Sequence, residues 1–321
     1  MNLPTGWTAR RPTLKDVPAI LAVVHASDIA AVGYPDFSAE EVREVMTAPN
    51  MDPARDSWVV LDADGEMVAW AYLDNPNGGH RDFVEVYVRP DRGEPAQAPL
   101  LARQLERVAE RVGEFGLARM WARAGAIPTE QRWIGILRDA GFEFVKRYAR
   151  MRRPLKDLSD VPPVAPPAVH IRLVDPESEA DLRSFHRIID TAFQDTEEHE
   201  STTYEQWRKW VDAEQTVPWD ECFMAVVDGE PVGALQSSNR GLDDNEGWVR
   251  YLAVLREHRH RGIGRALLAS AFAVYAGKGR QYAGLGVDLT NPTEAARLYR
   301  SVGMTPMYES DNFERAVTAI S

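Results

Sequence analysis

The sequence is poor in cysteine, in long apolar runs and in positive charge. Its only cysteine is Cys222, so no disulfide can form within the chain, which agrees with a cytoplasmic location and equally with an exported protein without disulfides. Because Cys222 begins an apolar stretch, we expect a buried structural thiol and not a nucleophile. No stretch reaches the roughly 18 consecutive apolar residues of a membrane span, and no apolar run follows a basic start, so neither membrane insertion nor secretion is indicated.

The charge balance restricts the class of partner. The chain has 37 Lys and Arg against 49 Asp and Glu, a formal net charge of −12. Nucleic-acid binding relies on clustered positive charge, so we expect no nucleic-acid partner. The balance suits a cationic acceptor, although many soluble proteins are acidic for solubility alone. An apolar fraction of 44% predicts an ordered globular protein. We expect it to be a monomer or a homodimer.

Proline marks a boundary near the middle of the chain. Five prolines lie in the segment from Pro154 to Pro167, a composition that favours an extended connector over a helix or a central strand. With 321 residues and roughly 100–200 residues per domain, the sequence predicts two domains. We place them at 1–153 and 169–321, with 154–168 as a proline-rich linker.

The two halves show the same order of elements, which indicates an internal duplication. Each begins with a strand and a helix. A hairpin follows, marked by Asp64-Gly65 in the first half and Asp228-Gly229 in the second. Each half then has a strand, an amphipathic helix, another strand, and a short helix that ends at Gly141 or Gly303. The pattern predicts two α/β units.

The segment from Arg259 to Arg265 has the features of an anion site. It reads Arg259-His260-Arg261-Gly262-Ile263-Gly264-Arg265, between a predicted strand and a predicted helix. Two glycines let the backbone approach a ligand, and the first helical turn offers unpaired N–H groups with a favourable dipole. The spacing fits neither a Walker loop nor a dinucleotide fingerprint. We expect it to bind a phosphate group.

In this context the motif Arg259-x-x-Gly262-x-Gly264 resembles the pyrophosphate signature of the GNAT acyltransferase superfamily, and the likeness continues through Asn291 and Tyr299 to Gly303. The resemblance implies an α/β (α+β) fold, in which each domain is a mixed, mostly antiparallel sheet flanked by helices. It implies acetyl-CoA as cosubstrate and no metal. It also implies that the backbone of Leu252, Ala253 and Val254 binds the pantetheine arm, and that Asn291 contacts the cofactor.

Tyr299 matches the position that in many members of the family protonates the departing thiolate. A phenol has a pKa of about 10 and stays protonated at neutral pH, as this role requires. The alternative is an ordinary core tyrosine. The general base is less clear, because the position that holds a glutamate in mycothiol synthases is Trp248 here. Glu246, two residues earlier, is our candidate, with a solvated loop carboxylate as the alternative.

A second acidic segment, which holds Asp195, Glu197, Glu198 and His199, could line the acceptor pocket or be a solvated loop.

The first half lacks these features. Its equivalent loop, 89–99, has no glycine pair and three prolines, which remove N–H donors. Leu137 and Thr129 stand where Tyr299 and Asn291 stand in the second half. We therefore expect a degenerate GNAT-like domain that contributes packing, pocket formation or both, a tandem arrangement that resembles mycothiol synthases.

The expected activity is direct acetyl transfer from acetyl-CoA to a primary amine of a small molecule. The alternatives are mycothiol synthesis, acetylation of a protein lysine or N-terminus, and a non-catalytic acyl-CoA sensor.

Overall fold

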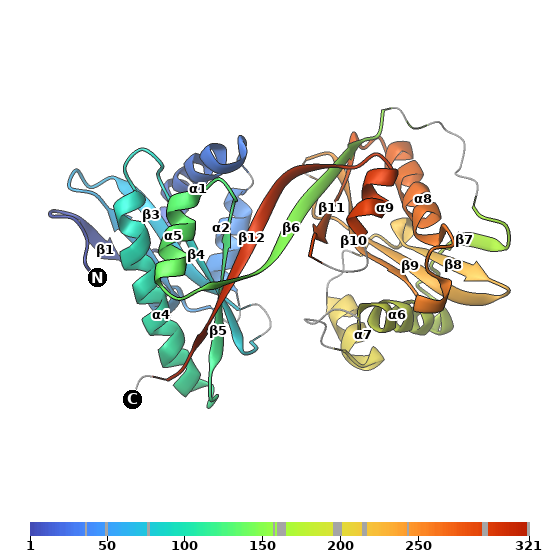
Figure 1. Ribbon diagram of the computed structural model, residues 1–321, viewed down its shortest axis with the longest axis horizontal. Helices are drawn as coiled ribbons and strands as arrows, with labels where there is room; N and C mark the ends of the chain where they lie inside the picture. The colour runs from blue at the N-terminus through green and yellow to red at the C-terminus, as the bar shows by residue number, and fades with distance from the viewer. Residues whose placement is uncertain are drawn as a thin grey trace. The chain divides into compact units, whose positions relative to one another are not determined.

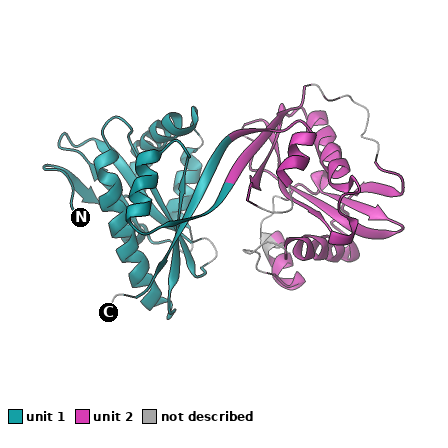
Figure 2. Cartoon of the chain, in the orientation of Figure 1, with its two compact units in different colours: residues 1–147, 308–321 teal, residues 148–307 magenta. Residues whose placement is uncertain are grey.

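The computed structural model describes residues 1–35, 37–48, 51–75, 78–156, 158, 165–194, 201–213, 217–242, 244–290 and 295–319. The chain forms two compact units, shown in different colours in Figure 2. Unit 1 comprises residues 1–147 and 308–321, and unit 2 comprises residues 148–307.

Unit 1 is a mixed sheet with helices on both faces. Its strands, in spatial order, are β1 (Thr8–Arg10), β2 (Ser57–Leu61), β3 (Met67–Asp74), β4 (Arg81–Val88), β5 (Met120–Ala126) and most of β12 (Thr305–Val317). The pair β4–β5 is parallel and the other recorded pairs are antiparallel. Its helical segments are η1 (Leu14–Asp16), α1 (Val17–Val32), α2 (Ala39–Thr47), α3 (Pro53–Asp56), η2 (Glu94–Ala96), α4 (Gln97–Glu114) and α5 (Gln131–Asp139).

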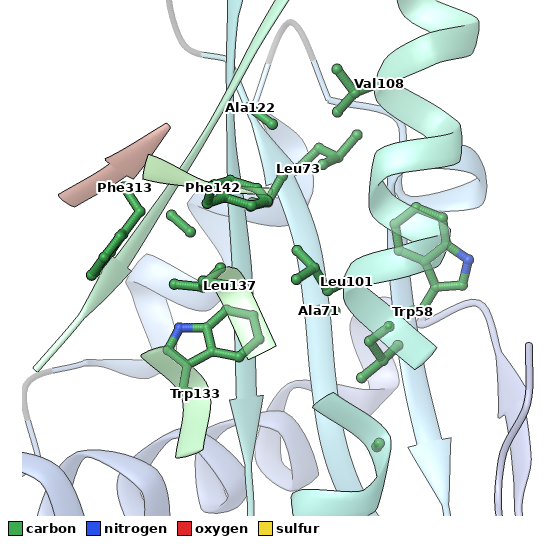
Figure 3. Packing of buried hydrophobic residues seen from close by; sticks show 14 of the residues in the cluster. Trp58, Ala71, Leu73, Leu101, Val108, Ala122, Trp133, Leu137, Phe142 and Phe313 are labelled. Carbon is green, nitrogen blue, oxygen red and sulfur yellow. The ribbon is translucent and has the colours of Figure 1, made fainter. Parts of the chain in front are cut away.

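Two apolar clusters hold unit 1 together, one on each face of its sheet. Helices α1 and α2 pack on one face, where Ile20 and Met46 meet Trp70. Helices α4 and α5 cover the other face, and Figure 3 shows Leu101 and Leu137 among the buried side chains there. The apolar faces of the strands and helices thus remove each other from water, the main favourable term in folding.

Unit 2 repeats this plan. In spatial order its strands are most of β6 (Glu143–Pro154), then β11 (Tyr282–Asp288), β10 (Glu246–Val254), β9 (Glu230–Ser238), β8 (Phe223–Val227) and β7 (Val169–Leu173). The pair β10–β11 is parallel and the other recorded pairs are antiparallel. Its helical segments are α6 (Glu179–Phe193), α7 (Tyr204–Ala213), η3 (Trp219–Glu221), η4 (Arg256–His258), α8 (Ile263–Gly277) and α9 (Ala295–Ser301), coloured from olive to red in Figure 1.

The sheet of unit 2 also has two covered faces. Phe185 and Ile188 of α6 pack with Met224 and Ala234 on one face. Helices α8 and α9 cover the other face, where Leu267 of α8 lies in the core. Asp228 and Gly229 join β8 to β9 with φ of 51° and 88°, the left-handed pair typical of a type I′ hairpin. The predicted fold class, two tandem domains of mixed, mostly antiparallel sheet, is confirmed.

The units exchange chain segments, which the division into 1–153 and 169–321 did not include. Strand β6 follows the last helix of the first half, yet its residues 148–154 pair with β11 of unit 2. Residues 311–317 of β12, at the end of the second half, pair with β5 of unit 1. Each sheet is therefore completed by a strand from the other half of the sequence, so the units do not coincide with the two halves.

Candidate active site

Strands β10 and β11 separate along their length. They pair only from Glu246–Tyr282 to Trp248–Gly284, although both strands continue beyond that point. On its other side β10 stays paired with β9 up to Val254, with an irregularity between Val249 and Tyr251. Such a bulge bends a strand and increases its twist. The stretch of β10 that contains Leu252, Ala253 and Val254 therefore has no recorded pairing on the β11 side.

A left-handed turn connects this strand to α8. His260 and Gly262 have φ of 61° and 79°, and Gly262 is the N-cap of α8. The first recorded bond of the helix runs from Ala266 N to Gly262 O at 3.0 Å. The N–H groups of the preceding turn therefore have no intrahelical acceptor, and the helix dipole adds partial positive charge there. This geometry suits an anion.

The arginines of the turn have different surroundings. Arg259 donates from Nε to Val254 O at 3.0 Å and from Nη2 to Ala192 O at 3.2 Å, so its side chain ties the turn to β10 and to the end of α6. Arg261 and Arg265 are exposed, and Nη1 of Arg261 lies 3.1 Å from Nδ1 of His258. Arg259 thus shapes the turn, while the two exposed arginines supply mobile charge.

Close packing brings the turn, the strand and α9 together at Gly264. A Cβ atom there would lie 3.1 Å from Leu298 Cδ2 and 3.9 Å from side-chain atoms of Leu252 and Val254. Any side chain longer than hydrogen would push into these neighbours, which explains the second glycine of the motif. The residues predicted to bind one cofactor are therefore neighbours in the fold, with the exception of Asn291, which lies outside the described residues.

Tyr299 follows Leu298 on α9 and is 8% exposed. Burial raises the pKa of its phenol to about 12, and its hydroxyl makes no hydrogen bond to a residue that the structure describes. The group is therefore protonated at neutral pH, the state that a general acid needs.

A cavity of about 410 Å³ lies beside α8 and α9. Two of its walls carry positive charge, from Arg265 in the first turn of α8 and from Arg153 on β6. Its complete lining is Arg153, Leu158, Arg265, Ala269, Phe272, Ser301, Val302 and Gly303.

Glu246 is the first residue of β10 and is completely buried, so the solvated-loop alternative is wrong. Its Oε2 accepts a hydrogen bond from Arg150 Nη2 at 2.8 Å, and its Oε1 lies 3.2 Å from Arg152 Nε. Both arginines belong to β6 and had no place in the sequence-based site. No local sequence motif marks these two arginines as site residues. They come close to Glu246 of β10 only because β6 pairs with β11 of unit 2. The catalytic role of Glu246 stays a prediction.

Trp248 lies on the same face of the sheet as Glu246. A Cβ atom on Gly284 would collide with Glu246 Oε1 at 2.2 Å and touch Trp248 Cε3 at 3.1 Å, so both side chains cross this glycine. The guanidinium carbons of Arg150 and Arg240 lie 5.2 and 5.0 Å from the centroid of the Trp248 ring. Trp248 is 7% exposed, so little of its ring is open to solvent, and the two guanidinium groups lie beside it.

The same face carries a further polar group that the sequence analysis missed. Gln236 of β9 is opposite Tyr251, is 1% exposed, and its Oε1 accepts no hydrogen bond from a described residue. Phe193 at the end of α6 packs edge to face on Tyr251, with centroids 5.6 Å apart. The segment with Asp195, Glu197, Glu198 and His199 lies outside the described residues.

Unit 1 has no equivalent anion site among its described residues. A Cβ atom on Gly93 would lie 2.3 Å from Val68 O and 2.7 Å from Arg89 N, so the backbone of this loop is packed against β3 and not open to a ligand. Leu137, at the position of Tyr299, is completely buried in the core. These features agree with a degenerate first domain.

Two further observations bear on sequence-based expectations. Cys222 is completely buried, and burial raises the pKa of its thiol to about 12, which confirms a structural thiol. Within the described ranges we find no cluster of three metal-ligating side chains and no helix that is long and apolar enough to span a membrane.

Comparison with known proteins agrees with this geometry. The model of the acetyltransferase (GNAT) family matches residues 182–304. A mycothiol acetyltransferase of Thermobispora bispora is 31% identical over 266 residues, which cover 79% of this chain and 81% of the relative.

Among solved structures, a GCN5-related N-acetyltransferase from Sphaerobacter thermophilus superposes with a TM-score of 0.85 at 26% identity, covering 100% of this chain and 99% of that one. A tandem GNAT protein from the clavulanic acid biosynthesis pathway shares the fold, with a TM-score of 0.67 at 16% identity and coverage of 98% and 100%. The chain therefore belongs to the GNAT acetyltransferase family, as an acyltransferase built from two GNAT-fold units in tandem.

Proposed function

We propose that unit 2 transfers the acetyl group of acetyl-CoA to the primary amine of a small molecule. The observation that carries this proposal is the convergence at Gly264 of three parts of one site. These are the N–H groups at the start of α8, the separated edge of β10, and the helix that carries Tyr299.

Each part of acetyl-CoA has a matching surface. The pyrophosphate would bind at the first turn of α8, where Gly262 and Ile263 begin the helix and Arg261 and Arg265 add charge. The pantetheine amides would bond to the backbone of β10 around Ala253, in the manner of an added strand. The 410 Å³ cavity with Arg153 and Arg265 would take the phosphorylated ribose end. Acetyl-CoA would supply the activated acetyl group.

In the proposed reaction Tyr299 has one role, the transfer of a proton to the departing sulfur. The neutral amine attacks the thioester carbon, the new C–N bond forms and the C–S bond breaks. Tyr299 gives its proton to the departing sulfur, the amine releases a proton to solvent, and the phenolate regains one from solvent, so the products are the amide, free CoA thiol and the original enzyme. With a pKa of about 12, Tyr299 is protonated before the reaction but is a weak donor, so its proton moves only as negative charge develops on the sulfur.

We further propose that Glu246 anchors β6 to β10 and does not remove the amine proton. A carboxylate that already binds two guanidinium groups and has no exposed surface offers an incoming amine no surface to contact.

The acceptor of mycothiol acetyltransferases is the second candidate. It is favoured by the 31% identity to the Thermobispora relative. It is disfavoured by Trp248, which replaces the glutamate expected in that group and cannot take up a proton.

The test is acetyl-CoA-dependent release of free thiol with a panel of small amines and lysine peptides, read with a thiol reagent. Cys222 does not interfere in the native protein, because the thiol is buried and its pKa is about 12. We expect release with one class of small amines. Thiol release with peptides only would contradict the proposal. So would binding of acetyl-CoA without thiol release in the presence of any amine tested.

A further inference from the structure

The acceptor face of unit 2 is rich in arginine. This face of β6, β11 and β10 carries Arg150, Arg152, Glu246 and Trp248, and the turn after β9 adds Arg240. It borders the point at which β10 and β11 separate, so an amine that approaches the acetyl group from this side passes it.

Two of these arginines are already neutralised. Arg150 and Arg152 share Glu246, and Arg150 also lies 3.4 Å from Asp244. Arg240 is different. It is exposed, and no described carboxylate lies within ion-pair distance of it, while its guanidinium lies 5.0 Å from the centroid of Trp248. An arginine held over an indole keeps its N–H donors available at the edge of its plane.

The turn that carries Arg240 is closely packed. Glu246 N donates to Gly241 O at 2.8 Å, and a Cβ atom on Gly241 would lie 2.9 Å from Glu246 O. The backbone that follows Arg240 is thereby fixed to the start of β10. The contact with Trp248 restrains the exposed side chain of Arg240, and a restrained guanidinium loses less entropy on binding a ligand than an unrestrained surface arginine.

On this same face the backbone of β11 is accessible at Gly286, which is opposite Arg150. Gly286 is exposed, and a Cβ atom there would meet nothing within 4 Å. Space therefore exists over β11 for the body of a ligand, and Trp248 with its two guanidinium groups borders that space.

We propose that the acceptor carries an anionic group, a carboxylate or a phosphate, in addition to its amine, and that Arg240, held on Trp248, binds this group. The inference rests on the proposed acetyl transfer in unit 2. A planar guanidinium matches the two oxygens of either anion. Trp248, in place of a proton-accepting carboxylate, then acts as a support for the specificity-determining arginine.

The experiment compares matched amines that differ in charge. The pairs are 6-aminohexanoate with 6-aminohexanamide, and glucosamine 6-phosphate with glucosamine, each assayed at saturating acetyl-CoA. The variant is Arg240→Gln, and the control is Arg43→Gln in unit 1, an exposed arginine whose loss changes the net charge equally.

We expect the wild type to prefer the anionic member of at least one pair by about tenfold in kcat/KM, as a charge-assisted hydrogen bond provides. Arg240→Gln should remove this preference through KM of the acceptor and leave KM of acetyl-CoA unchanged, and Arg43→Gln should behave as the wild type.

Turnover of both members with equal kcat/KM, or a preference that survives Arg240→Gln, would overturn the inference and leave acetyl transfer standing. Absence of thiol release with every amine would instead refute the proposed function on which it rests.

Discussion

Replacement of Glu246 by glutamine tests whether this carboxylate stabilises the sheet or moves a proton. Glutamine keeps the shape but removes the charge, so Arg150 and Arg152, whose side chains are 10% and 22% exposed, lose their shared counterion. Removal of one partner of a buried ion pair costs about 3–5 kcal/mol. Because Arg152 still reaches water, we expect the lower end, about 3 kcal/mol.

The assay is thermal unfolding together with the pH dependence of kcat/KM. A loss of about 3 kcal/mol corresponds to a fall in Tm of about 6–12 °C for a unit of this size. The fall of kcat/KM at low pH should occur at the same pH in Glu246→Gln as in the wild type. A compensating variant, Glu246→Leu with Arg150→Met and Arg152→Met, should regain most of the lost stability, since apolar residues often replace a buried ion cluster without cost.

A different outcome for Glu246→Gln would refute the anchoring role. An unchanged Tm, with kcat lowered by about 10²–10⁴-fold and the acid limb lost, would make Glu246 the general base and refute the anchoring role.

Two further predictions concern Tyr299 and the exchanged strands. Tyr299→Phe should keep the fold and the affinity for acetyl-CoA while lowering kcat by about 10²–10⁴-fold, and because the pKa of the phenol is about 12, wild-type kcat should show no alkaline limb from this group between pH 8 and 10. Unchanged turnover with chemistry rate-limiting would make it a core residue only. The fragment 169–321 should fail to fold, because it lacks residues 148–154, which supply Ala149 and Met151 to the core of unit 2. A soluble fragment with a cooperative unfolding transition would show that the exchanged strand is dispensable.

Local signals carried most of what the sequence predicted correctly. Gly262 stands where the chain needs a left-handed residue before a helix, and Asp228-Gly229 forms the hairpin that its composition favours. The predicted strand up to Val254 and the helix after Gly262 are both present, because strand and helix periodicities depend on neighbours in sequence.

The features that the sequence did not predict depend on pairing between strands that are far apart in the chain. Which strand fills a sheet depends on the edges available in three dimensions, so nothing local in β6 shows that its second part pairs with β11. The same exchange turns Glu246 from an apparent loop carboxylate into a buried partner of Arg150 and Arg152. The side-chain role of Arg259 was hidden for a similar reason, since its acceptor Ala192 O lies on a distant helix.

The central claim is that unit 2 alone binds acetyl-CoA, at the start of α8. Isothermal titration calorimetry of the full chain should give one site. Gly262→Glu should weaken binding by about 100-fold or more, because a carboxylate at the start of α8 would repel the phosphates of acetyl-CoA and crowd Pro166. The matched control is Gly279→Glu, which has the same left-handed backbone, φ 78° against 79°, at the other end of α8 and should bind as the wild type does. Two equivalent sites, or undiminished binding by Gly262→Glu, would contradict the account.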